Sequence, residues 1–187
     1  MARSDLTPFS YAILALVGDG GAGPHDIVRM MRQGRMYWTA AESHYYAEPK
    51  RLERLGYLVS RKEPGRTRER THYSLTDRGR DALRDWVAEP ATLPRIQHEA
   101  VVKLLAADLA DDETIRESLG AMRADIEDAY GRLDAAEAIA RTLPHRERYL
   151  LLVHGLGRRL LAAHEEWLDD VERELGRAQP RRRPSVR

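Results

Sequence analysis

The sequence predicts a mainly α-helical protein with one small β-hairpin, and three observations support this fold class. Apolar residues recur every three or four positions through most of the 187-residue chain. The spacing changes to alternation only around residues 57–75, and prolines and glycines separate the periodic segments. With 42% hydrophobic and 33% charged residues, the composition is typical of a globular protein with a packed core.

Two short helices are expected at the start of the chain. Thr7 can cap the first helix, Pro8 suits its first position, and Gly18 ends it. A second helix is expected over residues 24–34, where apolar residues again recur at helical spacing.

A third helix is expected from Thr39, whose hydroxyl can form a capping box with Glu42, to Gly56 at its C-terminal end. Pro49 falls inside this segment and removes one backbone hydrogen bond. We therefore expect either a kink or a helix that begins properly only near Glu48.

The alternating segments predict a β-hairpin. Residues 57–62 and 70–75 form its strands, and the polar residues 63–69 form its tip. Thr76 or Asp77 then caps a fourth helix that ends at Pro90. Three helices, a hairpin and a further helix, in this order, indicate a winged helix-turn-helix domain over residues 1–89.

The rest of the chain is predicted to be helical. After a linker at residues 90–94, a short helix is expected around residues 98–107 and a long one from Asp111 or Asp112 to Leu143. A second long helix follows Pro144, and the short turn between the long helices makes them antiparallel. Residues 90–176 thus form a helical domain, and residues 177–187 form a basic tail that we expect to be disordered.

Apolar residues in the long helices recur at alternating steps of three and four, the spacing of a coiled coil. Because two helices cannot bury so wide a seam alone, a second copy of the chain is the expected partner. The residues predicted to form this dimer interface are Ile115, Leu119, Met122, Ile126, Leu133, Leu150, Val153, Leu160, His164, Trp167 and Val171.

Charge is divided unevenly along the chain. Residues 1–90 carry 15 basic and 12 acidic side chains, whereas residues 91–176 carry 11 and 18. This division directs polyanions to the N-terminal half. The cations of that half fall on the third helix and the hairpin, the elements with which a winged helix contacts double-stranded DNA. A solvated charged face without a partner is the alternative. The predicted DNA-binding residues are Ser43, His44, Tyr46, Lys50, Arg51, Arg54, Arg66, Arg68 and Arg70.

Several motifs together resemble the PadR-type transcriptional regulators. They are Ala12-Ile13-Leu14-Ala15-Leu16, Gly23-Pro24-His25-Asp26-Ile27, Trp38, Ser43-His44-Tyr45-Tyr46-Ala47, the run from Lys50 to Leu58, and the run from Arg70 to Arg80. The helical second half is similar to the dimerisation region of the same regulators. Two positions depart from the family pattern: His25-Asp26 replaces a Gly-Tyr pair, and Ala47 replaces a proline that this chain carries instead at position 49.

The resemblance implies a homodimeric repressor that binds a near-palindromic operator and is released when a small molecule binds. It implies that Tyr46, Lys50 and Arg51 face DNA from the recognition helix and that Arg66, Arg68 and Arg70 contact DNA from the wing. Related regulators bind flat aromatic compounds partly through a tryptophan at the position of Trp86. Trp38, Trp86 and Trp167 are therefore candidates for an effector pocket, with ordinary core or interface packing as the alternative.

The sequence argues against catalysis. It has no cysteine, no His-Glu-x-x-His metal motif, no nucleophile elbow and no phosphate-binding or dinucleotide-binding glycine loop. We expect no catalytic residues, no metal site and no cofactor. No apolar stretch approaches the roughly 18 residues of a membrane span, and no signal peptide is evident, so a cytoplasmic protein is expected. Two other functions stay open: a protein-interaction module without a specific DNA target, and, more weakly, an enzyme that uses a Trp-lined interface.

Overall fold

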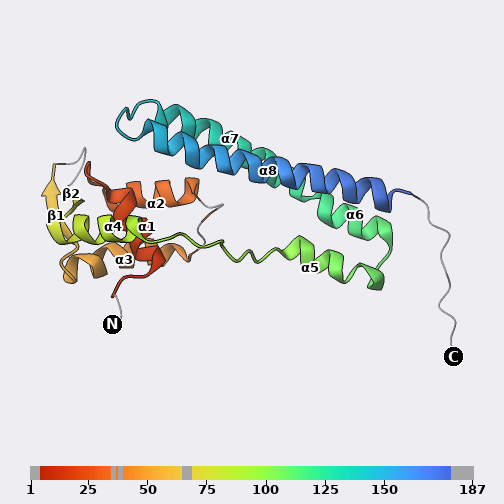
Figure 1. The fold of residues 1–187 in the computed structure, drawn as a ribbon, viewed down its shortest axis with the longest axis horizontal. Helices are drawn as coiled ribbons and strands as arrows, with labels where there is room; N and C mark the ends of the chain where they lie inside the picture. The colour runs from red at the N-terminus through yellow and green to blue at the C-terminus, as the bar shows by residue number, and fades with distance from the viewer. Residues whose placement is uncertain (1–4, 35–36, 38–39, 65–68, 178–187) are drawn as a thin grey trace. The chain divides into compact units, whose positions relative to one another are not determined.

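A computed structural model describes residues 5–34, 37, 40–64 and 69–177. The chain is mainly helical with one two-stranded antiparallel sheet, which confirms the predicted fold class (Figure 1). It divides into two compact units, residues 1–93 and 94–187. Each unit has its own buried apolar cluster, and the two clusters share no residue. Residues 89–98, between the last helix of the first unit and the first helix of the second, form no helix or strand.

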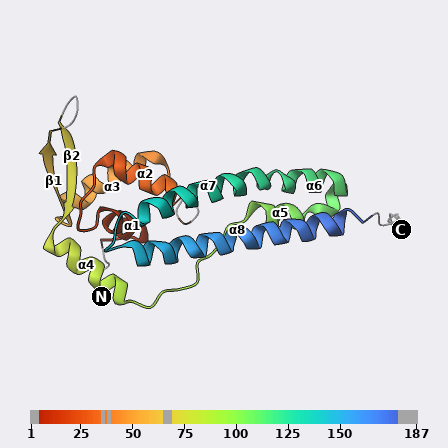
Figure 2. The same ribbon diagram turned by 90° about the horizontal axis from the view of Figure 1, so that it is seen from above.

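The first unit contains four helices and the hairpin in the predicted order. These elements are α1 (Pro8–Val17), α2 (Pro24–Gln33), α3 (Glu42–Arg54), β1 (Leu58–Glu63), β2 (Arg70–Leu75) and α4 (Asp77–Ala88). Ile13, Ile27, Leu52 and Leu58 are fully or almost fully buried and hold the helices and the hairpin around one core. Figure 2 shows the hairpin projecting from this group of helices.

Helix boundaries follow the local signals in most places. Thr7 caps α1 in a capping box with Ser10, and Pro8 is the first helical residue, as predicted. The predicted start of α3 is wrong, because Ala41 is its N-cap and Thr39 lies outside the described residues. A start near Glu48 is wrong too. Helix α3 continues through Pro49, which is buried, so packing outweighs the one backbone hydrogen bond that proline removes.

The hairpin strands pair in one register, from Leu58 opposite Leu75 to Glu63 opposite Arg70. Ala22 forms an isolated antiparallel bridge with Tyr73 of β2, in which the two residues exchange two backbone hydrogen bonds of 2.9 Å. The turn before Ala22 requires glycine at position 21 for two reasons. The φ of Gly21 is +70°, and a Cβ at this position would lie 2.1 Å from the His72 ring. The hairpin is thereby fixed to the segment between α1 and α2.

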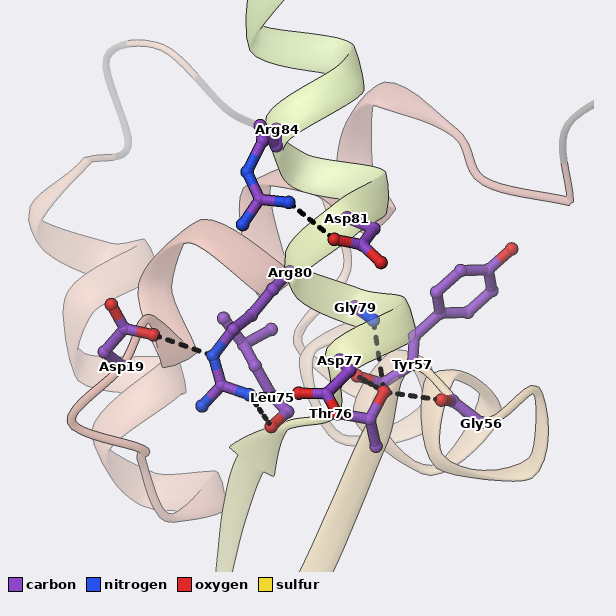
Figure 3. Close-up of polar contacts among 10 residues, drawn as sticks. All are labelled: Asp19, Gly56, Tyr57, Leu75, Thr76, Asp77, Gly79, Arg80, Asp81 and Arg84. Carbon is purple, nitrogen blue, oxygen red and sulfur yellow. Dashed lines mark hydrogen bonds and ion pairs between the residues drawn. The ribbon is translucent and has the colours of Figure 1, made fainter.

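Thr76 joins the base of the hairpin to α4 (Figure 3). Its hydroxyl accepts the backbone N–H of Gly79 at 3.1 Å and donates to the carbonyl of Gly56 at 2.7 Å. Arg80 adds a second connection, since its guanidinium donates to the Leu75 carbonyl and pairs with Asp19 at 3.1 Å (Figure 3). The end of α3, both strands and the start of α4 are therefore connected by hydrogen bonds.

The described residues of the second unit form helices and connecting segments and no strand. It contains α5 (Glu99–Leu105), the short 3-10 helix η1 (Ala107–Leu109), α6 (Asp112–Gly120), α7 (Met122–Ala140) and α8 (Glu147–Leu175). Both α6 and α7 pack along α8, and Figure 2 shows this arrangement. The prediction of one continuous helix to Leu143 is wrong, because the helix is interrupted at Ala121. Gly120, which has a low helix propensity, directly precedes the interruption, whereas Gly131 lies within α7 without a break.

Much of the apolar seam is buried within a single chain. Ile115, Leu119, Ile126, Leu133 and Val171 all belong to the core of the second unit. Met122, Leu150, Leu160, His164 and Trp167 are half-buried, and Val153 is exposed. Contacts of α6 and α7 with α8 therefore bury five of these eleven residues within one chain, and the other six stay half-buried or exposed. No helix among the described residues is long and apolar enough to cross a membrane.

Candidate nucleic-acid interface

Helix α3 presents one exposed stripe of short and basic side chains. Ser43, Ala47, Lys50 and Arg54 are all exposed and follow one another at steps of four, three and four, so they share a face. The opposite face carries Tyr45, which is buried in the core together with Pro49 and Leu52. We call the four exposed residues the α3 stripe. An α-helix fits the major groove of B-DNA, where Lys and Arg reach base edges and phosphates.

Two further predicted residues flank this stripe. His44 is exposed near the start of α3. Tyr46 is half-buried, and its ring meets the edge of His25 at 6.1 Å between centroids. The His25 ring therefore borders the recognition helix at one of the positions that depart from the family pattern.

Arg51 is the exception among the predicted residues of α3. Its Nε donates to Glu48 Oε2 at 3.0 Å, and one Nη donates to the backbone carbonyl of Asp5 at 2.8 Å. Its side chain is 33% exposed, and that of Glu48 only 13%. The guanidinium is directed toward the start of α1 and away from the α3 stripe.

The hairpin adds exposed cations. Arg61, Lys62 and Arg70 are exposed on the paired strands, whereas Arg66 and Arg68 lie outside the described residues. Arg61 was not among the predicted contacts, although its place one residue before Lys62 on the same strand could have indicated it. Arg70 lies 3.6 Å from Glu63, so one of the described wing cations is partly neutralised.

Acidic side chains near these cations are largely occupied by the protein itself. Glu53 accepts both the backbone N–H and the hydroxyl of Ser60, at 3.2 and 2.5 Å, and Glu63 lies within 4 Å of Arg70 and His72. The Glu48 carboxylate accepts hydrogen bonds from the Ser10 hydroxyl and from Arg51 Nε. Because these carboxylates point into hydrogen bonds, Lys50 and Arg54 dominate the exposed face of α3.

The three tryptophans are not brought together within one described unit. Trp86 stacks on Tyr11 in the first unit, with 4.7 Å between ring centroids and 6° between ring planes. Trp38 lies outside the described residues. Trp167 is half-buried in the second unit, with its ring at a steep angle to His98.

His98 and His164 form a pair beside Trp167. His98 Nδ1 accepts the backbone N–H of Val101, so its Nε2 carries the proton and donates to His164 Nε2 at 2.9 Å. His164 Nδ1 donates to the Leu160 carbonyl at 2.5 Å. Both rings are neutral in this arrangement. Burial, and then the neighbouring His164, lower the pKa of His98 below its ordinary value. The described residues contain no group of three or more side chains suited to a metal ion.

Comparisons with known proteins agree with this geometry. Residues 13–85 match the Transcriptional regulator PadR-like family, and residues 96–176 match the Virulence activator alpha C-term family. Residues 13–85 are therefore a PadR-like domain, and the chain as a whole is similar to PadR-like regulators. It is a DNA-binding transcriptional regulator, and proteins of this family are not enzymes. The interpretation as an interaction module without a DNA target is accordingly not favoured.

Individual relatives of this PadR-like protein cover nearly its whole length. The negative transcriptional regulator PadR of Bacillus subtilis is 28% identical over 174 residues, which cover 86% of this chain and 93% of the relative. The crystal structure of B. subtilis PadR with operator DNA has a TM-score of 0.69 at 22% identity and covers 91% of this chain and 98% of that one. The structure of the same protein with p-coumaric acid has a TM-score of 0.62 at 20% identity, covering 93% and 97%.

Proposed function

We propose that this PadR-like regulator is a homodimeric repressor that places the α3 stripe in the major groove of a near-palindromic operator. The single observation that carries the proposal is the α3 stripe itself, with Lys50 and Arg54 exposed while the nearby carboxylates are occupied within the protein. Ser43, His44 and Tyr46 border the groove, and Arg61, Lys62 and Arg70 reach flanking phosphates, together with Arg66 and Arg68 at the tip. Such a regulator works where the chromosome is, so we place it in the cytoplasm.

Exposed apolar residues of the second unit support a homodimer. Tyr149, Leu152, Val153 and Leu156 recur at helical spacing on α8 and are 47–66% exposed, and α5 carries Val102 and Leu105, 63% and 80% exposed. Large exposed apolar stripes of this kind are usually covered by a partner. We propose that these stripes, continued by the half-buried Leu150, Leu160, His164 and Trp167, form the dimer interface, while Ile115, Leu119, Met122, Ile126, Leu133 and Val171 support it from beneath.

A small aromatic effector is proposed from the p-coumaric acid complex of the B. subtilis relative. Trp86 supports an aromatic site, because it is half-buried and already stacks on Tyr11. Titration with p-coumaric acid should quench tryptophan fluorescence in the wild type and not in Trp86→Phe. A flat titration across phenolic acids would refute the effector proposal without affecting operator binding.

The DNA contacts are tested by the salt dependence of binding to a duplex selected from a random pool on the wild-type protein. Lys50→Ala combined with Arg54→Ala should lower the slope of log K against log[salt] by about 1.8, since each lost phosphate contact removes about 0.9. Arg84→Ala is the matched control, because Arg84 is an exposed cation of the same unit paired with Asp81 on α4. A slope equal to that of the wild type in the double variant would refute the placement of α3.

The homodimer is tested by sedimentation of Leu152→Glu combined with Leu156→Glu. Both side chains are at least half exposed, so the change leaves the core of the second unit intact. The variant should sediment as a single chain and the wild type as two. Two chains in both samples would exclude this face of α8 from the interface.

A further inference from the structure

Helix α3 carries a largely buried carboxylate on the side opposite its exposed stripe. Glu48 Oε1 accepts a 2.6 Å hydrogen bond from the hydroxyl of Ser10, a polar residue of α1 with no exposed surface. The other carboxylate oxygen accepts Arg51 Nε at 3.0 Å. Two helices thus share one charge-assisted contact, which is shorter and stronger than a neutral hydrogen bond.

Arg51 completes this contact and is held by it. Beyond Glu48, its guanidinium donates to the Asp5 carbonyl at 2.8 Å and to the Ser10 hydroxyl at 3.3 Å. These partners hold the charge beside the N-terminal end of α1. Arg51 lies one turn after Ala47 of the α3 stripe, so a released side chain would meet the DNA backbone that the stripe contacts.

Moving Arg51 onto a phosphate would leave Glu48 largely buried and without an opposite charge. Such an uncompensated buried charge is strongly unfavourable, and its cost exceeds the gain from one added phosphate contact at physiological salt. The wild-type protein therefore keeps Arg51 away from DNA. This outcome differs from the expectation of the sequence, in which Arg51 faces the operator.

We infer that Glu48 is a positioning residue that limits the strength and the salt dependence of DNA binding, because it anchors α3 to Ser10 and withholds Arg51 from phosphate binding. The inference rests on the proposed use of α3 in the major groove. Contacts to phosphates add affinity for any sequence, whereas contacts to base edges discriminate between sequences. Withholding one phosphate contact therefore lowers the affinity for operator and for non-operator DNA by the same factor and leaves the ratio between them unchanged.

The test compares the full-length wild type with Glu48→Gln, Arg51→Gln and the double variant. Each protein is titrated at 50 to 200 mM salt with the selected duplex and with a shuffled duplex of the same composition. In Glu48→Gln, the new amide still accepts the Ser10 hydroxyl but no longer neutralises Arg51. The salt slope of this variant should steepen by about 0.9, equivalent to an additional loss of about 3-fold to 4-fold in affinity across this salt range. Its preference for the selected duplex over the shuffled one should stay unchanged, because a phosphate contact strengthens binding to both duplexes alike.

Arg51→Gln should bind with the slope of the wild type, and the double variant should return to that slope. A slope about 0.9 shallower in Arg51→Gln would show that Arg51 contacts phosphate in the wild type and would overturn the inference, while leaving the regulator proposal intact. That measurement decides the matter even if Glu48→Gln fails to fold. Failure of the proposed function is a different result: no sequence is enriched from the random pool by the wild-type protein.

Discussion

Replacing Gly79 by alanine tests how α4 is joined to the hairpin. A Cβ at this position would lie 2.2 Å from the Tyr57 carbonyl oxygen and 3.3 Å from a methyl carbon of Leu75. The carbonyl is not free to move, because it accepts the backbone N–H of Thr76 at 3.1 Å. The backbone must therefore separate by about 1 Å, and interiors packed to crystal density resist such a shift.

The magnitude follows from the bonds that this shift disturbs. Overpacking costs about 1–3 kcal/mol. Loss of the Thr76 cap, whose acceptor bond runs to the N–H of residue 79, adds about 1 kcal/mol. We expect Gly79→Ala to lower the free energy of unfolding of the first unit by about 2–4 kcal/mol.

Urea denaturation followed by tryptophan fluorescence measures this change. A Trp167→Phe background confines the signal to residues 1–93, which contain the other two tryptophans. The matched control is Gly20→Ala, because Gly20 lies in the same unit with nothing within 4 Å of a built Cβ. If the free energies of unfolding of Gly79→Ala and Gly20→Ala differ by less than about 0.5 kcal/mol, the close approach of α4 to Tyr57 is wrong.

Two other predictions concern the aromatic clusters. Burial lowers the pKa of His98 in the folded protein, so the unfolded chain takes up the proton first as the pH falls. The contribution of neutral His98 to the free energy of unfolding is therefore complete above the ordinary pKa of 6.5 and is lost as the pH falls below it. The urea midpoint of the Trp167 signal should decrease when the pH is lowered from 7.5 to 5.5. The decrease should be smaller in His98→Asn, which keeps an N-cap side chain. An equal pH dependence in both proteins would contradict this prediction. Trp86→Ala should destabilise the first unit by about 0.5–1.5 kcal/mol more than Trp86→Phe, since only Phe can still stack on Tyr11, and identical midpoints would show that the stack is not stabilising.

The winged half was largely predictable because its signals are local. The alternation of residues 70–75 placed β2 at its observed bounds, and Thr76, one of the two residues predicted to cap α4, is its N-cap. Gly56 was predicted to end α3 and has a φ of +77°, a conformation that favours glycine. Each of these features depends on a few neighbouring residues, so tertiary packing did not override it.

Features that depend on distant partners were not predictable from the chain. A coiled-coil period looks the same whether the seam faces another subunit or another helix of the same chain, and Leu119 and Ile126 face their own α8. Arg51 is a basic residue of α3, and the sequence alone predicts that it faces DNA. Its redirection by Glu48 and Ser10 was not predictable, because Ser10 belongs to another helix. Likewise, the break at Ala121 was not predicted, because Gly120 and Gly131 give the same local signal and only the first lies at a break.

The exposed, irregular segment at residues 89–98 has a consequence for how such regulators diversify. Most of it, residues 89–95, lies between the end of one family match at residue 85 and the start of the other at residue 96. Since the two apolar clusters share no residue, an exchange of gene segments at this junction would divide neither core. Such an exchange offers a route by which one winged domain is joined to a different helical domain.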